Sequence, residues 1–100
     1  MDAQPWYGVR CVIQMGDLFE ERVTLWLATD LDDAIAKAEA EAREYAGIVG
    51  GAYLGLAQAF HLAAEELESG VEVFSLIRQS PLSGDDYLAA YFDTGTERQR

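Results

Sequence analysis

Two strand-forming runs separated by a glycine-containing turn constrain the fold of this chain most strongly. Residues 6–15 and residues 19–28 both alternate between two sets of side chains and are rich in β-branched and aromatic residues. Gly16 and Asp17, which lie between the two runs, are typical turn residues. Two alternating runs joined by so short a turn predict an antiparallel β-hairpin.

The register of this hairpin decides which side chains share a face of the sheet. A two-residue loop would pair Cys11 with Arg22 and would place polar side chains on the apolar face. A loop one residue longer would pair Cys11 with Val23, so that both strands present apolar side chains to the same side. Because register generally follows the buried face, we expect the longer loop.

The segment after the hairpin has the pattern of an amphipathic helix. Thr29 or Asp30 can serve as the N-cap, and an acidic residue follows three positions later, as in a capping box. One apolar stripe at helical spacing contains Leu31, Ala34, Ile35, Ala38, Ala42, Tyr45 and Ala46. Gly47 is a typical C-terminal stop. We therefore predict one long helix that ends near residue 47 and packs its alanines against the sheet.

The C-terminal half indicates two further elements. Residues 71–79 alternate as a strand does, and Pro81 follows as a strand breaker. Residues 83–86 form a second capping-box pattern and predict a short helix. This helix would include Tyr87, Leu88, Tyr91 and Phe92. Residues 52–67 fit both a helix and a strand, and the residues by themselves leave that choice open.

Several short sequence words, taken together, resemble a family of small bacterial proteins, common in actinobacteria, known as domain of unknown function 4288. They are WYGVRCV at 6–12, FEERVTLW at 19–26, YLGLAQAFH at 53–61, EVFSLIR at 72–78, YL at 87–88 and FDTG at 92–95. The resemblance covers nearly the whole chain, but it implies no activity and no functional residue. It does imply a strand at about residues 52–62. The expected fold is then α+β in the order β-β-α-β-β-α, with a four-stranded antiparallel sheet, one long helix on one face and a short C-terminal helix.

Length and charge limit the class of protein. One hundred residues predict a single domain over residues 1–100, with flexible ends at 1–5 and 96–100. The net charge of −11 disfavours nucleic acid and anionic membranes and suits a basic protein partner. The first residues lack the features of a signal peptide, and no apolar run approaches the ~20 residues of a membrane span. We therefore expect a cytoplasmic protein that does not bind membranes.

The chain has no motif for catalysis or for a bound cofactor. Cys11 and His61 are the only cysteine and histidine, and no third residue is identifiable that would orient them as a nucleophile and a base. Cys11 lies on the apolar side of its strand, as an inert core thiol does. The acidic clusters at residues 30–33 and 65–68 do not match a calcium loop. We predict no catalytic residue, no cofactor, no metal site and no enzymatic activity.

The sheet face opposite the predicted core is too apolar to remain in water without a cover. The candidate interaction residues on this face are Trp6, Arg10, Arg22, Thr24, Trp26, Gln58, Phe60, Phe74 and Arg78. Three interpretations stay open: the C-terminal helix covers this face, a homodimer buries it, or an anionic ligand binds at Arg10, Arg22 and Arg78.

The hypothesis that follows is a non-enzymatic protein-interaction module whose acidic exterior binds or inhibits a basic partner. A role like that of an immunity protein fits this description. One alternative is a protein that binds a small anionic ligand on the face of arginines and aromatic residues. The other is a structural homodimer that is accessory to a neighbouring protein.

Overall fold

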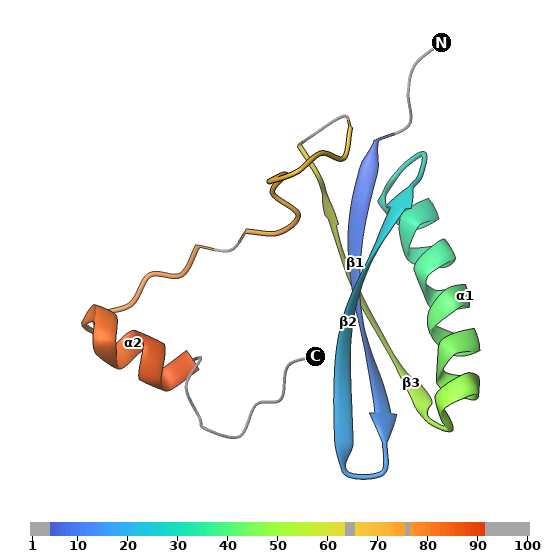
Figure 1. The fold of residues 1–100 in the computed structure, drawn as a ribbon, viewed down its shortest axis with the longest axis horizontal. Coiled ribbons are helices and arrows are strands. Elements are labelled where there is room, and N and C mark those ends of the chain that lie inside the picture. The colour runs from blue at the N-terminus through green and yellow to red at the C-terminus, as the bar shows by residue number, and fades with distance from the viewer. Residues whose placement is uncertain (1–4, 64–65, 76, 92–100) are drawn as a thin grey trace.

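The computed structural model describes residues 5–63, 66–75 and 77–91 and has two layers, a sheet and a helix that covers one face of it (Figure 1). The elements are β1 (Trp6–Met15), β2 (Leu18–Leu27), α1 (Leu31–Val49), β3 (Ala52–His61) and α2 (Gly84–Tyr91). The three strands form one antiparallel sheet in the order β2-β1-β3. Residues 1–4 and 96–100 of the predicted flexible ends lie outside the described residues, as does Phe92.

The α+β class is as predicted, but the predicted four-stranded sheet is wrong. Residues 71–75 and 77–79, expected to be the fourth strand, join no sheet. The backbone–backbone hydrogen bond found in this described segment is local and joins the Val71 N–H to the Glu68 carbonyl oxygen at 3.1 Å. An alternating sequence supplies the side chains of a strand but not the neighbouring edge with which a strand must pair. Here the segment contacts the sheet through Phe74 but pairs with none of its strands.

The predicted hairpin is present, but the predicted longer loop is wrong. Met15 pairs with Leu18, so the loop consists of Gly16 and Asp17 alone, and Cys11 pairs with Arg22. Gly16 has a φ of 62°, whereas no non-glycine residue among those described has a positive φ. Glycine with positive φ at the first loop position is the pattern of a type II′ turn, whose twist matches that of two-residue hairpins. The turn therefore fixes a register that the apolar pattern does not favour.

The core lies between β1 and α1. The buried side chains that β1 contributes are Tyr7, Val9, Cys11 and Ile13, and those of α1 are Ala34, Ala38, Ala42 and Ala46. All four on β1 are odd-numbered, so they share one face of the strand. The alanines recur every four residues and have short side chains, which lets the helix lie close to the sheet. The predicted alanine stripe is confirmed as the contact surface of this helix.

Side-chain and glycine caps set the ends of α1. Asp30, with an extended backbone (φ −160°), accepts a hydrogen bond from the Asp33 N–H at 2.8 Å. The Thr29 N–H donates in turn to the Asp33 carboxylate at 2.9 Å and lowers the pKa of that carboxyl, with help from Lys37. The helix ends at Val49 because Gly50 (φ 72°) takes the left-handed conformation. The stop predicted near residue 47 is therefore two residues early.

The strand implied at about residues 52–62 and the predicted C-terminal helix are both confirmed. β3 pairs with β1, and its register shifts between Cys11 and Ile13, near Gly55 (φ 83°). Such a shift with a left-handed glycine is typical of a β-bulge. The Asp86 N–H donates to the Ser83 hydroxyl at 3.2 Å, as the capping pattern predicted for α2.

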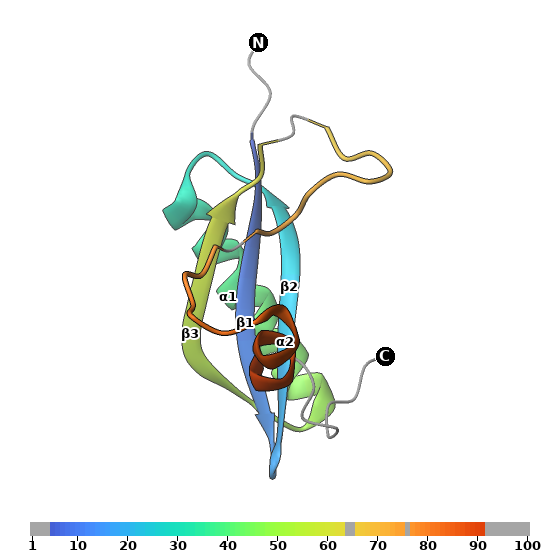
Figure 2. The same cartoon turned by 90° about the vertical axis from the view of Figure 1, so that its left-hand side faces the viewer.

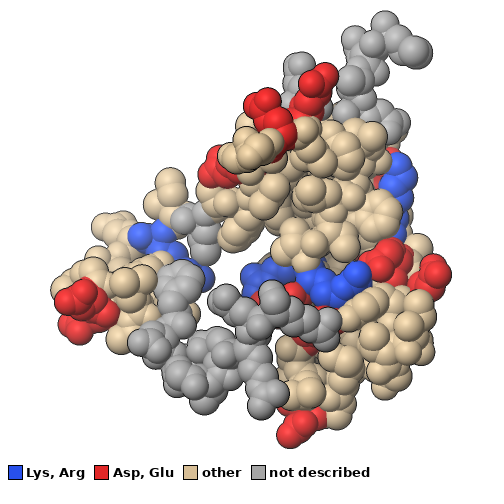
Figure 3. Space-filling view, in the orientation of Figure 1, with Lys and Arg blue, Asp and Glu red and all other residues tan. Residues whose placement is uncertain are grey.

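α2 lies on the side of the sheet opposite α1 and is held away from it (Figures 1 and 2). None of its residues is buried. The Cα radius of gyration is 16.0 Å, against about 13 Å for a compact domain of 100 residues. The space-filling view shows an opening between α2 and the body formed by the sheet and α1 (Figure 3). No helix of the described residues is long and apolar enough to cross a membrane.

Candidate interaction face

The sheet surface turned away from α1, here called the open face, is the candidate site. It carries the even-numbered residues of β1, their cross-strand partners on β2 and the corresponding residues of β3. Its larger side chains are Trp6, Arg10, Val12, Phe19, Val23, Leu25, Leu27, Leu56, Gln58 and Phe60. Phe19, Val23 and Leu56 are 59%, 51% and 54% exposed. The open face is thus a largely apolar surface without a covering layer among the described elements.

The charges on the open face cancel locally. The Arg10 guanidinium donates to the Glu21 carboxylate on the neighbouring strand, and both side chains are about half exposed. Together with Val12, Leu56 and Gln58 they line a shallow hollow of about 280 Å³. Because the arginine already has an acidic partner, the hollow offers an anion little uncompensated positive charge.

One end of the open face carries an aromatic cluster. A Cβ atom at Gly8 would lie 2.3 Å from ring atoms of Phe60, so only glycine leaves room for the Phe60 ring to lie over β1. The ring of Phe74 packs against that of Phe60 with centroids 5.0 Å apart. This contact joins the segment after residue 70 to the sheet. Both aromatic residues were predicted for the interaction face, and the structure brings them together with Trp6, Arg10 and Gln58 on one side of the sheet.

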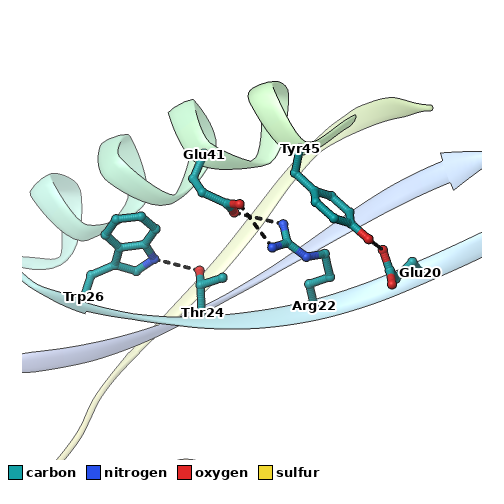
Figure 4. Close-up of polar contacts among 6 residues, drawn as sticks. All are labelled: Glu20, Arg22, Thr24, Trp26, Glu41 and Tyr45. Carbon is teal, nitrogen blue, oxygen red and sulfur yellow. Dashed lines mark hydrogen bonds and ion pairs between the residues drawn. The ribbon is translucent and has the colours of Figure 1, made fainter. Parts of the chain in front are cut away.

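Three other predicted residues lie on the opposite, helix-covered face, so their assignment to the interaction face is wrong. Arg22, Thr24 and Trp26 pair with the buried side of β1 because the loop has two residues instead of three. All three are partly buried under α1. The Trp26 indole N–H donates to the Thr24 hydroxyl at 2.7 Å (Figure 4). These side chains belong to the interior of the two-layer body.

An ion pair joins β2 to α1 within this interior. Both terminal nitrogens of Arg22 donate to the Glu41 carboxylate, at 2.8 and 3.1 Å, and this hydrogen bonding raises the pKa of Arg22 (Figure 4). The guanidinium also lies over the Tyr45 ring, 3.7 Å from its centroid. The Tyr45 hydroxyl donates to Glu20 at 2.5 Å. This network satisfies charged groups within the body and stabilises the packing of α1.

Arg78 lies apart from the other two arginines of the predicted anion site. Its guanidinium donates to the Tyr87 hydroxyl at 3.3 Å and stacks on the Tyr91 ring at 4.9 Å. Arg10 and Arg22 lie on opposite faces of the sheet. Each of the three arginines thus engages a different partner, and the structure does not assemble them around one anion.

The chemistry of Cys11 and His61 is that of structural residues. Cys11 is 3% exposed, and burial raises the pKa of its thiol. The His61 ring packs on Tyr7, its cross-strand partner, with centroids 5.1 Å apart. Cys11 lies four residues beyond Tyr7, which is roughly 13 Å along the strand. The two groups therefore cannot act as a nucleophile and its base.

The described residues contain no group of three side chains that could hold a metal ion. In the acidic cluster at residues 30–33, Asp30 and Asp33 cap α1. Residues 64–65, which include part of the second predicted acidic cluster, lie outside the described ranges.

The sequence pattern did not identify Val23, Leu25 and Leu27 as part of this face, because the predicted longer loop places alternate residues of β2 from Val23 onward on the same side as Cys11. The structure places them on the open face. The signal that could have found them is the Gly16-Asp17 pair, because glycine at the first loop position favours a two-residue type II′ turn. With a two-residue loop, Val23, Leu25 and Leu27 lie on the open face, and Arg22, Thr24 and Trp26 lie under α1.

Comparison of the chain with protein-family models, with curated proteins and with solved structures gives no match. The resemblance to domain of unknown function 4288 therefore stays a prediction.

Proposed function

We propose that this chain is a non-enzymatic protein-interaction module and that the open face is its contact surface. The observation that supports this proposal is a sheet face with large, half-exposed apolar side chains on its two outer strands, β2 and β3. Monomeric proteins rarely leave so large an apolar surface in water, and exposed apolar patches commonly mark protein contacts. The hydrogen-bonded network beneath α1 gives the sheet a stable support for such a surface.

The composition of the open face favours a protein over a small molecule. Its hollow is shallow, and its one arginine pairs with Glu21. A small-molecule site is usually a deep pocket with convergent polar groups. Aromatic side chains and arginine within an apolar surface are instead typical of the centre of a protein interface.

The net charge of −11 supports a second candidate function, in which the chain binds or inhibits a basic protein through surfaces other than the open face. Acidic groups are spread over several elements, including α2 and the loop beyond β3 (Figure 3). They are not concentrated on the open face, where Glu21 is compensated by Arg10. A basic partner would therefore contact other surfaces, and high salt would weaken its association.

The test places a photo-crosslinking amino acid at Val23 of the full chain, expressed in cells. The matched control carries it at Ile48, which is apolar and 77% exposed but lies near the end of α1. We expect protein adducts at Val23 that are absent at Ile48, that persist at high salt and that Leu56→Asp greatly reduces. Equal adducts at the two positions, or none at Val23, would overturn the proposal. Adducts that disappear at high salt would instead favour the basic partner.

A further inference from the structure

α2 lacks the packing that a helix of its length needs. It has eight residues and buries none of them. Isolated helices shorter than ~12–15 residues are marginal in water. Its described contacts come from Arg78 and from the packing of Tyr87 on Tyr91, while Leu88 and Tyr91 remain about half exposed. This helix therefore has an apolar side that its own chain does not cover within the described residues.

The segment before α2 has a strand-like sequence but forms no strand among its described residues. Residues 71–79 alternate like a strand, yet residues 72–75 and 77–79 make no backbone–backbone hydrogen bond among the described residues. Ile77 is 96% exposed. Unpaired backbone groups and a bare isoleucine are the features that strand addition to a sheet would satisfy.

The sheet offers an edge that suits such a strand. In the order β2-β1-β3 the outer edges of β2 and β3 are both unpaired among the described residues. β2 carries Glu20, Glu21 and Arg22, and charges of this kind normally guard an edge against further pairing. β3 has no charged residue and no proline over residues 52–61. The edge of β3 is therefore the less protected of the two.

The chain's own segment does not follow its own β3 edge. Residues 72–75 and residues 60–63 line a shared hollow of about 240 Å³, and Phe74 packs on Phe60 there. From this contact the chain leads away on the side of the open face and carries α2 with it (Figures 1 and 2). α2 thus lies on the open-face side but apart from the sheet, and the alternating segment does not pair with the edge of β3 (Figures 1 and 2).

We infer that residues 71–91, here called the arm, are exchanged between two copies of this chain. Residues 71–79 of one copy add to the outer edge of β3 in the second copy as a fourth strand. α2 then lies with its apolar side on the open face of that second copy. This inference rests on the proposed function, because it names a second copy as the partner of the open face. In a two-fold exchange, the β3 edge of each copy gains a neighbouring strand and the open face of each copy is covered. Exchange of an element between identical chains is a low-cost route to a dimer.

The first test measures the solution mass of the full chain by light scattering. We expect about twice the 11.0 kDa chain mass. We expect this mass at low and at high salt, because the contact is apolar and the chain is strongly acidic. Ile77→Asp should give a monomer, and the matched control Ile48→Asp should stay dimeric. Ile77 is the more exposed of the two in the isolated chain. A monomeric wild-type chain, or equal behaviour of the two variants, would overturn arm exchange.

The second test distinguishes exchange from closure of the arm on its own sheet. A photo-crosslinking amino acid is placed at Ile77, and isotopically heavy and light copies are refolded together. Adducts that join a heavy chain to a light chain and map to residues 52–61 are expected. Adducts to residues 52–61 formed only within one chain would mean closure in cis and would overturn exchange.

The two proposals fail in different ways. If the chain is monomeric and Val23 crosslinks to a different protein, arm exchange fails while the interaction module stands. If Val23 gives no adduct beyond those at Ile48, the open face is not a contact surface and both proposals fail.

Discussion

Along β2, the covered face of the sheet carries polar side chains and the open face carries apolar ones. The face under α1 receives Glu20, Arg22 and Thr24, yet it is the covered one. The open face receives Val23, Leu25 and Leu27, yet no described element covers it. Polar side chains can lie beneath a helix when the helix supplies their partners, as Glu41 and Tyr45 do for Arg22 and Glu20. The difference teaches that burial here follows the partners available across the layer and not hydrophobicity alone.

The contrast between the faces has a consequence for association. A partly buried polar network favours one arrangement of α1 on the sheet, because each charged group would otherwise lose its partner. An uncovered apolar face, in contrast, accepts whichever surface removes it from water. The covered face therefore holds the fold together, and the open face is available for a partner.

The largest expected effect is a difference in the free energy of unfolding between the same valine-to-alanine substitution on the covered face and on the open face. Val9 is fully buried under α1, whereas Val23 is half exposed on the open face. We expect Val9→Ala to lower the free energy of unfolding by about 2 kcal/mol. In the monomer, at low protein concentration, Val23→Ala should lower it by less than about 0.5 kcal/mol. Urea denaturation of both variants measures this difference. Equal losses would break the comparison, and a loss at Val23 that grows with protein concentration would place a partner on the open face.

An intermediate effect is expected from the two ion pairs, because loss of the Arg22–Glu41 pair should lower the free energy of unfolding more than loss of the Arg10–Glu21 pair. Arg22→Met keeps the apolar stem but leaves Glu41 without its bidentate donor in a partly buried site. After a discount for solvent screening, we expect a loss of about 1 kcal/mol. Arg10→Met on the open face should cost less than about 0.5 kcal/mol, because that pair is more exposed. Thermal or urea unfolding checks both variants, and a larger loss at Arg10 would contradict the assignment of the two faces.

The smallest expected effect is a loss of stability at alkaline pH that originates on the covered face. Burial raises the pKa of Cys11, and burial together with the hydrogen bond to Glu39 raises the pKa of Tyr53. The unfolded chain then binds fewer protons than the folded chain once the pH exceeds the ordinary pKa of these groups. Stability is therefore full below about pH 8 and falls as the pH rises further. Urea unfolding between about pH 7 and about pH 11 measures the slope, because the ordinary pKa of tyrosine is about 10.

Cys11→Ala and Tyr53→Phe provide the controls for this effect. Each variant removes one titrating group, so each should flatten the alkaline decline. A decline that is unchanged in the double variant would show that other groups cause it.

Local patterns predicted the elements whose signals are complete within a short segment. The Asp30 cap, the alanine stripe of α1 and the Ser83 cap of α2 are such signals, and all three are confirmed. The open-face positions of Trp6, Arg10, Gln58 and Phe60 also agree with the prediction, since their strands alternate as expected. For Arg22, Thr24 and Trp26 the prediction failed because one residue of loop length moves every side chain of a strand to the other face.

The sequence by itself determined the class of the protein and its helix boundaries to within a few residues, whereas the alternating pattern of residues 71–79 did not produce a strand. The class and the helix boundaries depend on periodicity and capping, which act over a few neighbouring residues. Only the tertiary structure decided that Arg22 lies beneath α1 and that residues 71–79 have no neighbouring strand within the described chain. Both depend on contacts between segments that are distant in sequence, and a strand or a buried charge is stable only where another element supplies its partner.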